Sequence, residues 1–282
     1  MLKDSYLACK SALEKGGIEN AAFEAQCMLE HLTGFGRASL LAHGGDAFDR
    51  QDELDEMIKR RLKNEPLQYI LGSWSFCGIE LLVGEGVLIP RDDTEVVLNL
   101  CLDFLKNKNI ATCVDLCSGS GAIALALERY AKADVTAVEL SDKAFYFLEK
   151  NIKDSNIDAL KDDVLTCHTR FKDNSFDLIV SNPPYIPSRE LPTLQAEVQF
   201  EPSMALDGGD DGCDFYRAIV RDWSSKLKTG GALAFELGEG QADAVRAMME
   251  GAGFTNIRTE TDFGGTHRAI IATCQSVLSW SM

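Results

Sequence analysis

Strand-like and helical segments alternate from Thr94 onward, and this alternation restricts the possible folds more than any other feature of the chain. Short apolar runs predict strands, and segments with helical spacing of apolar residues predict the helices between them. The predicted strands are 114–116, 135–138, 176–180 and 232–237, and the predicted helices are 122–129, 143–152 and 214–227. Strands with nearly continuous apolar runs are typical of a parallel sheet covered by helices on both faces. The sequence therefore predicts a Rossmann-like α/β domain with a mostly parallel sheet.

The end of the chain departs from this alternation. Two strand-like runs, 257–261 and 268–273, are joined by a short turn that contains Gly264-Gly265. Parallel neighbours need a crossover of a dozen or more residues, whereas antiparallel neighbours need only a tight turn. We therefore expect the last strand to run antiparallel.

The amino-terminal part of the chain has a different texture. Apolar residues at helical spacing extend to about Leu62, and glycines divide them, which predicts a small helical bundle that ends before Pro66. Short aromatic runs follow, and they suggest a hairpin that pairs 74–76 with 79–83. We expect a helical domain at 1–65, a hairpin linker at 66–93 and the α/β domain at 94–282.

Composition and charge exclude several classes of protein. The 44 acidic and 28 basic residues give a formal charge of −16, which disfavours long-range attraction to nucleic-acid phosphates. Nine scattered cysteines without a CxxC pair indicate a reducing compartment, and four widely separated histidines offer no zinc-ligand spacing. No apolar run reaches the roughly 18 residues of a membrane span. We expect a cytoplasmic protein without a metal or a membrane anchor.

A glycine-containing turn joins the first predicted strand to the next helix. Its residues are Cys117, Ser118, Gly119, Ser120 and Gly121. The glycines permit a tight turn and close approach of a ligand to backbone N–H groups. Turns of this kind bind NAD, FAD and S-adenosylmethionine alike, and some are purely structural.

Two later positions favour a nucleoside ligand beside this turn. Glu139 ends the next strand 18 residues after Gly121 (139 − 121), which suits a carboxylate that reaches ribose hydroxyls. Val164, after Asp162-Asp163, offers an apolar surface for an adenine ring. The alternative for Glu139 is a solvated acid that caps the next helix, and the alternative for 162–164 is an ordinary acidic loop. If Cys117 lies beside the cofactor, thiol modification should inhibit, whereas a buried thiol would be inert.

The most specific motif is Asn182-Pro183-Pro184-Tyr185, which directly follows the apolar strand 176–180. Open α/β folds bind their ligands at the carboxyl ends of such strands. The two prolines fix the backbone and remove two N–H donors, so that carbonyls remain as acceptors, and Asn182 adds a side-chain carbonyl. Tyr185 adds an aromatic face. The alternative interpretation is a rigid structural loop.

This set of acceptors suits a planar NH2 group. The lone pair of an amide or aromatic amine nitrogen is delocalised, so the nitrogen is a poor nucleophile. Hydrogen bonds from both protons, to the Asn182 side-chain oxygen and the Pro183 carbonyl, would hold it and favour pyramidalisation towards a methyl donor. Positioning and electrostatics then replace a strong base. We predict an S-adenosyl-L-methionine-dependent methyltransferase in which Asn182, Pro183 and Tyr185 are catalytic and Asn182–Tyr185 bind the substrate.

Further segments support a specific resemblance. These segments and Asn182–Tyr185 carry the resemblance. The chain resembles, over nearly its whole length, the protein-glutamine methyltransferase family that modifies peptide chain release factors. The segments that carry the resemblance are Pro66–Gly72, Val87–Arg91, Glu201–Arg217 and Phe235–Gly238 with Gln241.

The resemblance implies methylation of the glutamine amide in the Gly-Gly-Gln motif of release factors, with the helical domain helping to dock the factor. It implies cofactor contacts from Cys117–Gly121, Glu139, Val164 and Asn182, and glutamine recognition by Asn182–Tyr185. We expect a monomer that takes part in translation termination and does not bind nucleic acid directly. Three positions depart from the family: Cys117 replaces a usual glycine, Asp92-Asp93 replaces Pro-Glu, and Val164 replaces a residue that is often aromatic.

Three alternatives stay open. A methyltransferase for adenine amino groups would use the same acceptor motif on a flipped base, although such enzymes carry basic surfaces and this chain has only the short run Lys59-Arg60-Arg61. A non-catalytic nucleotide-binding module would retain the fold without needing Asn182 and Tyr185. A dinucleotide oxidoreductase would account for the glycine turn but not for the Asn-Pro-Pro-Tyr loop.

Overall fold

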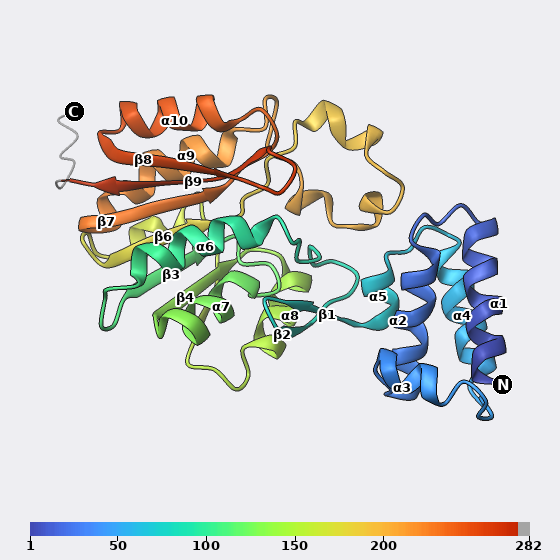
Figure 1. Ribbon diagram of the computed structural model, residues 1–282. Helices are drawn as coiled ribbons and strands as arrows, with labels where there is room; N and C mark the ends of the chain where they lie inside the picture. The colour runs from blue at the N-terminus through green and yellow to red at the C-terminus, as the bar shows by residue number, and fades with distance from the viewer. Residues whose placement is uncertain (276–282) are drawn as a thin grey trace. The chain divides into compact units, whose positions relative to one another are not determined.

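The computed structural model describes residues 1–275 and separates the chain into two compact units (Figure 1). The first unit comprises Met1–Ser73 together with the short segment Gln195–Phe200, and the second comprises Trp74–Leu194 and the chain from Glu201 onward. The membership of 195–200 in the first unit is a feature that the sequence pattern does not reveal. The domain bounds given above remain predictions. None of the helices formed by residues 1–275 has the length and apolar composition that crossing a membrane requires.

The first unit is built from helices, as the spacing of its apolar residues predicts. They are α1 (Leu2–Lys15), α2 (Ala21–Thr33), α3 (Arg37–Ala42), α4 (Gln51–Arg61) and α5 (Leu67–Leu71). Side chains on the facing sides of α1, α2 and α4 are fully buried, among them Leu13, Met28, Leu29 and Leu54. The sequence did not predict α5, whose five residues are too few for a helical period to be recognised.

A buried arginine ties this unit together. The guanidinium of Arg61 donates to both carboxylate oxygens of Glu24, at 2.6 and 3.1 Å, and to Glu197 Oε2 at 2.7 Å. Arg61 is 5 % exposed and Glu24 is 8 % exposed. The two-pronged pairing satisfies charges that would be costly to bury alone. Glu197 brings the segment 195–200 into the same network.

The predicted hairpin is confirmed. Strands β1 (Ser73–Phe76) and β2 (Ile79–Leu82) form a two-stranded sheet. Cys77 and Gly78 link them with φ angles of 48° and 70°, as a two-residue turn of the favoured hairpin type requires. The side-chain amide of Asn151 holds β2, because it accepts from Leu82 N at 2.7 Å and donates to Leu82 O at 3.0 Å.

The second unit contains a seven-stranded sheet in the order β5-β4-β3-β6-β7-β9-β8. Strands β3 to β7 pair in parallel, which confirms the mostly parallel Rossmann-like sheet. The strands are β3 (Thr112–Leu116), β4 (Asp134–Glu139), β5 (Asp158–Lys161), β6 (Phe176–Ser181), β7 (Leu227–Glu236), β8 (Phe254–Thr261) and β9 (His267–Cys274). The helices are α6 (Thr94–Leu105), α7 (Ala122–Ala131), α8 (Asp142–Asn151), α9 (Asp214–Trp223) and α10 (Ala242–Gly251).

The carboxyl end of the chain confirms the antiparallel last strand. Strand β9 lies between β7 and β8 and runs antiparallel to both. Helix α10 was not predicted, since its apolar residues are interrupted by the acidic residues Asp243 and Glu250. The predicted helix 214–227 is shorter than expected: α9 ends at Trp223, a 3-10 turn follows at Ser224–Lys226, and Leu227 already starts β7.

Both faces of the sheet are covered, which explains its nearly continuous apolar strands (Figure 1). One face packs against residues of α6, α7 and α8, and the opposite face packs against α9 and α10. Along β3, Cys113 belongs to the first core and Val114 to the second, as alternating side chains of a doubly covered strand must.

The position of β3 creates a crevice in the second unit. Leu116 at the end of β3 pairs with Val138 of β4 on one side and with Ser181 of β6 on the other. The chain leaves these two neighbours in opposite directions, so the loops at their carboxyl ends diverge. Such a switch point is where open α/β sheets bind their ligands.

The Arg61 network gives a test of stability. Replacing Glu24 with alanine leaves a buried guanidinium without its main partner, so we expect the free energy of unfolding of the helical unit to fall by about 3–5 kcal/mol. Glu197 is 38 % exposed in its side chain, so Glu197→Ala should cost much less. Denaturant unfolding of the full chain, followed by helical circular dichroism, measures both variants. Equal effects of the two substitutions would contradict this assignment.

Candidate active site

A cavity opens at the carboxyl ends of β3, β4 and β6, entirely within the second unit. Its empty volume is about 1060 Å³, including the open mouth, which is sufficient for a nucleoside-sized ligand. Four groups of residues that the sequence singled out line it: the turn after β3, the end of β4, the loop after β5, and the start of the acceptor motif. They are Cys117, Ser118, Gly119, Ser120, Glu139, Val164, Asn182 and Pro184. The structure therefore brings together residues that are up to 67 positions apart (184 − 117).

The turn between β3 and α7 is held by the protein itself. Ser118 N donates to Val138 O at 3.0 Å, Gly119 N donates to Glu139 Oε2 at 2.9 Å, and Gly121 N donates to Ser118 O at 2.8 Å. We had expected these N–H groups to face a ligand. Three of them instead have protein acceptors, so the turn contributes its shape and its small side chains rather than these donors.

Glu139 fastens the end of β4 to this turn. Its Oε2 accepts from Gly119 N, and its Oε1 accepts from Ser141 N at 2.8 Å. Burial raises the pKa of the Glu139 carboxyl, and the backbone donors oppose that rise. A carboxylate has about four lone-pair sites, so the group retains acceptor capacity towards the cavity.

Asp115 is a site residue that the sequence analysis did not select. It is 1 % exposed, its Oδ2 accepts from Ala124 N at 3.1 Å, and its Oδ1 has no hydrogen-bond partner among residues 1–275. Burial raises the pKa of this carboxyl to about 8. The signal in the sequence was an acidic residue within the apolar strand Thr112–Leu116, where a carboxylate has no structural reason to lie.

Val164 forms a side of the cavity that the core supports. It is 5 % exposed, and its carbonyl accepts from the indole nitrogen of Trp223 at 2.8 Å. Trp223 is itself fully buried. The apolar surface expected at this position is therefore present and firmly held.

Cys117 lines the cavity with a thiol whose pKa is raised. Burial, together with the nearby Glu139 carboxylate, raises the pKa of the thiol far above its ordinary value. The residue has a φ of 61°, a left-handed conformation that glycine adopts at lower cost. Because the thiolate is the reactive form, this geometry supports the interpretation of Cys117 as an inert thiol.

The side-chain amide of Asn182 has a defined orientation. Its Nδ2 donates to Thr94 Oγ1 at 3.3 Å, and Thr94, at the first turn of α6, is 4 % exposed and lines the same cavity. The hydrogen bond commits the NH2 group of Asn182 to the protein. Its Oδ1 thereby remains as an acceptor. The sequence gave no signal for Thr94, because only the fold brings α6 next to the end of β6.

Tyr185 is partly buried and oriented by a carboxylate at the end of β7. Its hydroxyl donates to Glu236 Oε1 at 3.1 Å, and Glu236 is 1 % exposed. Burial raises the pKa of Glu236 to about 7, while hydrogen bonds from Thr94 and Tyr185 lower it. Burial and the same carboxylate raise the pKa of the Tyr185 phenol. Glu236 thus contacts Tyr185 directly and contacts Thr94, the partner of Asn182.

The two prolines between Asn182 and Tyr185 have different environments. Both are buried, but Pro184 lines the cavity, whereas Pro183 lies outside the set of described residues that line it, as do Tyr185 and Gly121. The assignments of Asn182, Pro183, Pro184 and Tyr185 to substrate therefore remain predictions.

One wall of the cavity comes from the segment before α6. Leu88, Ile89, Pro90 and Arg91 line it. Glu201 fixes this wall, because its carboxylate accepts from Ile89 N at 2.9 Å and pairs with Arg91. Glu201 was noted only through the family resemblance, and its position follows from the loop that returns to the sheet after β6.

Comparisons with known proteins follow the two parts of the chain. A family model described as the PrmC N-terminal domain matches residues 7–72, and one described as Conserved hypothetical protein 95 matches residues 93–206. The crystal structure of a methyltransferase from Pyrococcus furiosus matches 79 % of this chain and 100 % of its own, with a TM-score of 0.54. At 18 % identity this likeness shows the fold alone.

Relatives match nearly the whole chain. The release factor glutamine methyltransferase of Geobacter sulfurreducens is 39 % identical over 268 residues, which cover 92 % of this chain and 91 % of that protein. The protein of the same name from Clostridium acetobutylicum is 33 % identical over 290 aligned positions, with 96 % and 98 % covered. The chain therefore belongs to the release factor glutamine methyltransferase family.

Proposed function

We propose that this protein transfers the methyl group of S-adenosyl-L-methionine to the side-chain amide nitrogen of the glutamine in the Gly-Gly-Gln motif of peptide chain release factors. The observation that supports this most directly is the oriented amide of Asn182 in the cavity at the switch point of the sheet. The relatives that match more than nine-tenths of the chain are named for methylation of release factor glutamine.

The residues of the cavity fit this cofactor. Glu139 retains lone pairs for ribose hydroxyls, Val164 offers an apolar surface for adenine, and Asp115 presents a buried oxygen without a partner among residues 1–275. A carboxylate in that environment favours a cationic partner such as the ammonium group of the methionine part. S-adenosyl-L-methionine supplies an electrophilic methyl group on its sulfonium, and Cys117–Gly121 shape the space beside it.

The acceptor residues act by binding and orienting the glutamine amide. Asn182 Oδ1 accepts one proton of the NH2 group, and the Pro183 carbonyl accepts the other. A neutral amide oxygen is suited to this task because it stabilises the positive charge that develops on nitrogen without binding a proton itself. Thr94 holds Asn182, so little reorganisation is needed when the substrate enters.

Tyr185 and Pro184 complete the site for the glutamine side chain. The Tyr185 hydroxyl is engaged by Glu236, so the aromatic ring keeps one orientation rather than rotating with the substrate. Pro184 presents an apolar surface in the cavity. In this proposal the helical domain docks the release factor, and the formal charge of −16 favours a basic protein surface over nucleic acid.

A methyl-transfer assay tests the substrate. Tritiated S-adenosylmethionine is incubated with purified release factor, with its Gln-to-Ala variant at the Gly-Gly-Gln motif, and with oligonucleotides. Label in the intact factor alone supports the proposal. Label in the oligonucleotides would instead favour a nucleic acid amino-methyltransferase.

Asn182→Ala should lower kcat by about 100- to 1000-fold, the usual effect of removing one acceptor or donor at the reacting atoms. The affinity for S-adenosylmethionine, measured by titration calorimetry, should change little in comparison, because Glu139, Asp115 and Val164 are untouched. Thr94→Val, which frees the Asn182 amide to rotate, should give a smaller loss of kcat. Unchanged turnover of Asn182→Ala would refute the role of its oxygen.

Asp115 gives a pH-dependent prediction for the free protein. Its pKa is raised from 3.8 to about 8 in the folded state, so the folded protein binds a proton that the unfolded chain has lost. The free energy of unfolding should therefore decrease as pH rises between these two values. Asp115→Asn should flatten this slope, and the exposed Asp134→Asn serves as control. Thermal unfolding at several pH values measures how the free energy of unfolding depends on pH. The same pH dependence in Asp115→Asn and wild type would contradict the prediction.

A further inference from the structure

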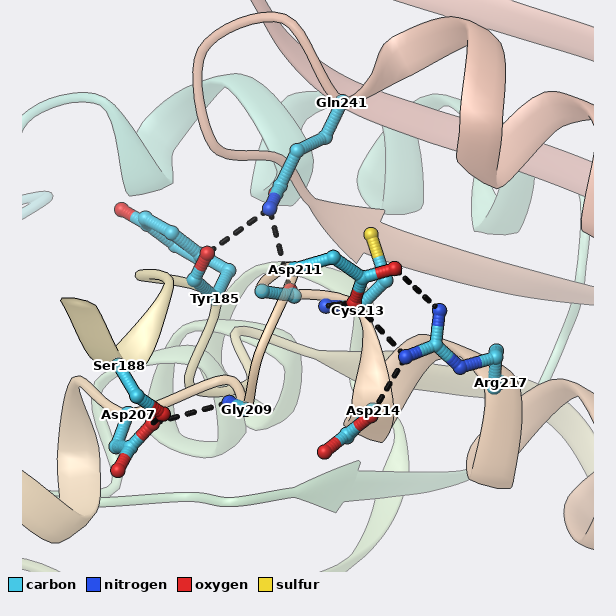
Figure 2. A network of polar contacts seen from close by, with 10 residues as sticks. Tyr185, Ser188, Asp207, Gly209, Asp211, Cys213, Asp214, Arg217 and Gln241 are labelled. Atoms are coloured by element: carbon cyan, nitrogen blue, oxygen red, sulfur yellow. Dashed lines mark hydrogen bonds and ion pairs between the residues drawn. The ribbon is translucent and has the colours of Figure 1, made fainter. Parts of the chain in front are cut away.

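A single glutamine side chain connects three segments around the acceptor motif. Gln241 Nε2 donates to Tyr185 O at 2.9 Å and to Gly212 O at 3.1 Å, and Gln241 Oε1 accepts from Gly238 N at 3.0 Å. The same oxygen accepts from the Tyr216 hydroxyl at 3.2 Å. Figure 2 shows the side chain reaching down from the start of α10 to the Tyr185 carbonyl.

These contacts engage both ends of the amide. Both protons point at carbonyls, and the oxygen receives the Gly238 N–H and lies 3.2 Å from the Tyr216 hydroxyl, whose single proton is shared with Glu236 O at 2.8 Å. Rotating the amide by 180° would place its oxygen against the carbonyls of Tyr185 and Gly212 and its NH2 group against the N–H of Gly238. The network therefore permits one orientation of Gln241.

Close packing surrounds the same contacts. A Cβ on Gly238 would lie 2.6 Å from Gln241 Oε1 and 2.9 Å from Tyr185 Cδ2. A Cβ on Gly208 would lie 2.7 Å from Tyr185 Cα. Larger residues at either position would displace Gln241 or Tyr185, so the two glycines allow the segments to approach.

The chain beyond Tyr185 is fastened separately. Ile186 N donates to Leu206 O at 2.8 Å, and Ser188 Oγ donates to Asp207 Oδ1 at 2.6 Å (Figure 2). Gly209 N donates to the same Asp207 oxygen at 3.0 Å. The backbone after Tyr185 thus has a fixed path, and Gln241 holds the Tyr185 carbonyl, where this path begins.

A displacement of Tyr185 would reach Asn182, which lies three residues earlier (185 − 182). The pyrrolidine rings of Pro183 and Pro184 fix two of the φ angles between them, so fewer backbone rotations remain to absorb the shift. From this we infer that Gln241 is a positioning residue, which sets the location of the Asn182 oxygen in the cavity by holding the Tyr185 carbonyl. The inference rests on the function proposed above, since it assigns that oxygen to the glutamine amide.

The first test separates positioning from cofactor binding. Gln241→Met keeps a similar side-chain length and removes all four hydrogen bonds, and Gln275→Met introduces the same change at an exposed position. With release factor as substrate, Gln241→Met should lower kcat by about 100-fold, since a displacement of about 1 Å at a reacting group has that effect. The Kd for S-adenosylmethionine should stay within about twofold, because Gln241 is outside the set of described residues that line the cavity.

The second test does not depend on activity. Hydrogen exchange of the free protein should be faster in Gln241→Met for the peptide that contains Tyr185, Ile186 and Ser188, and unchanged in Gln275→Met. Gly238→Ala serves as a second variant if Gln241→Met does not fold, because its Cβ would press on Gln241 and Tyr185. Gly251→Ala is its control, since a Cβ there meets no atom within 4 Å.

The outcomes decide the two proposals independently. A folded Gln241→Met variant with the kcat of the wild type overturns the positioning role, as does a loss of kcat matched by an equal loss of cofactor affinity. If the wild-type protein itself transfers no methyl group to release factor, the proposed function fails. The exchange comparison still decides in that case, because unchanged protection at Tyr185–Ser188 overturns the role of Gln241.

Discussion

The hydrogen bond between the Ser181 hydroxyl and the Leu116 carbonyl, 2.7 Å long and fully buried, joins the ends of β6 and β3. The cofactor turn begins at the next residue after Leu116, and the acceptor motif begins at the next residue after Ser181. The two reacting groups must approach within van der Waals distance, so the ends of these strands have to keep a constant separation. The pairing of Leu116 with Ser181 in neighbouring strands provides this constant separation. The surrounding residues then orient the groups that line the cavity.

Three buried carboxyl groups line the carboxyl end of the sheet, and each stands in a different chemical situation. Glu139 is engaged by two backbone donors and supports the turn, whereas Asp115 Oδ1 and Glu236 Oε2 have no hydrogen-bond partner among residues 1–275. Glu236 receives the Tyr185 hydroxyl. Burial raises the pKa of all three, so hydrogen-bond donors or a cation placed beside them would favour their charged forms.

The parts of the fold that follow from local pattern were predictable, and those that depend on distant contacts were not. Apolar runs identified β3, β4 and β6, because these strands are buried on both faces, and the antiparallel end was recognised from two strand-like runs joined by a short glycine turn. Helix α10, with acidic residues among its apolar ones, and the five-residue α5 gave too weak a period. Segment 195–200 joins the helical unit through Glu197, a contact with Arg61 across 136 positions that no local signal encodes.

The candidate site divides in the same way. Asn182–Tyr185 and Glu139 stand in short motifs at predicted strand ends, so their residue types indicated chemistry directly. Thr94 and Asp115 reach the cavity only because the sheet brings α6 and β3 to the end of β6, and neither belongs to a recognisable motif. The amide N–H groups of the turn were expected to face a ligand, but a local pattern cannot show that Glu139 and Val138 already accept from two of them.

The protein itself illustrates the binding mode proposed for its substrate. The side chain of Gln241 is a glutamine amide whose two protons are accepted by two backbone carbonyls, at 2.9 and 3.1 Å. Its oxygen also faces donors, the Gly238 N–H and the Tyr216 hydroxyl, so the amide is held at both ends. A substrate glutamine held by Asn182 and Pro183 would have its protons bound in the same way but would lie in the cavity that Cys117–Ser120 border. The difference between a structural glutamine and a reactive one then lies in access to the methyl donor rather than in the strength of the hydrogen bonds, because both sets of acceptors are neutral carbonyl oxygens.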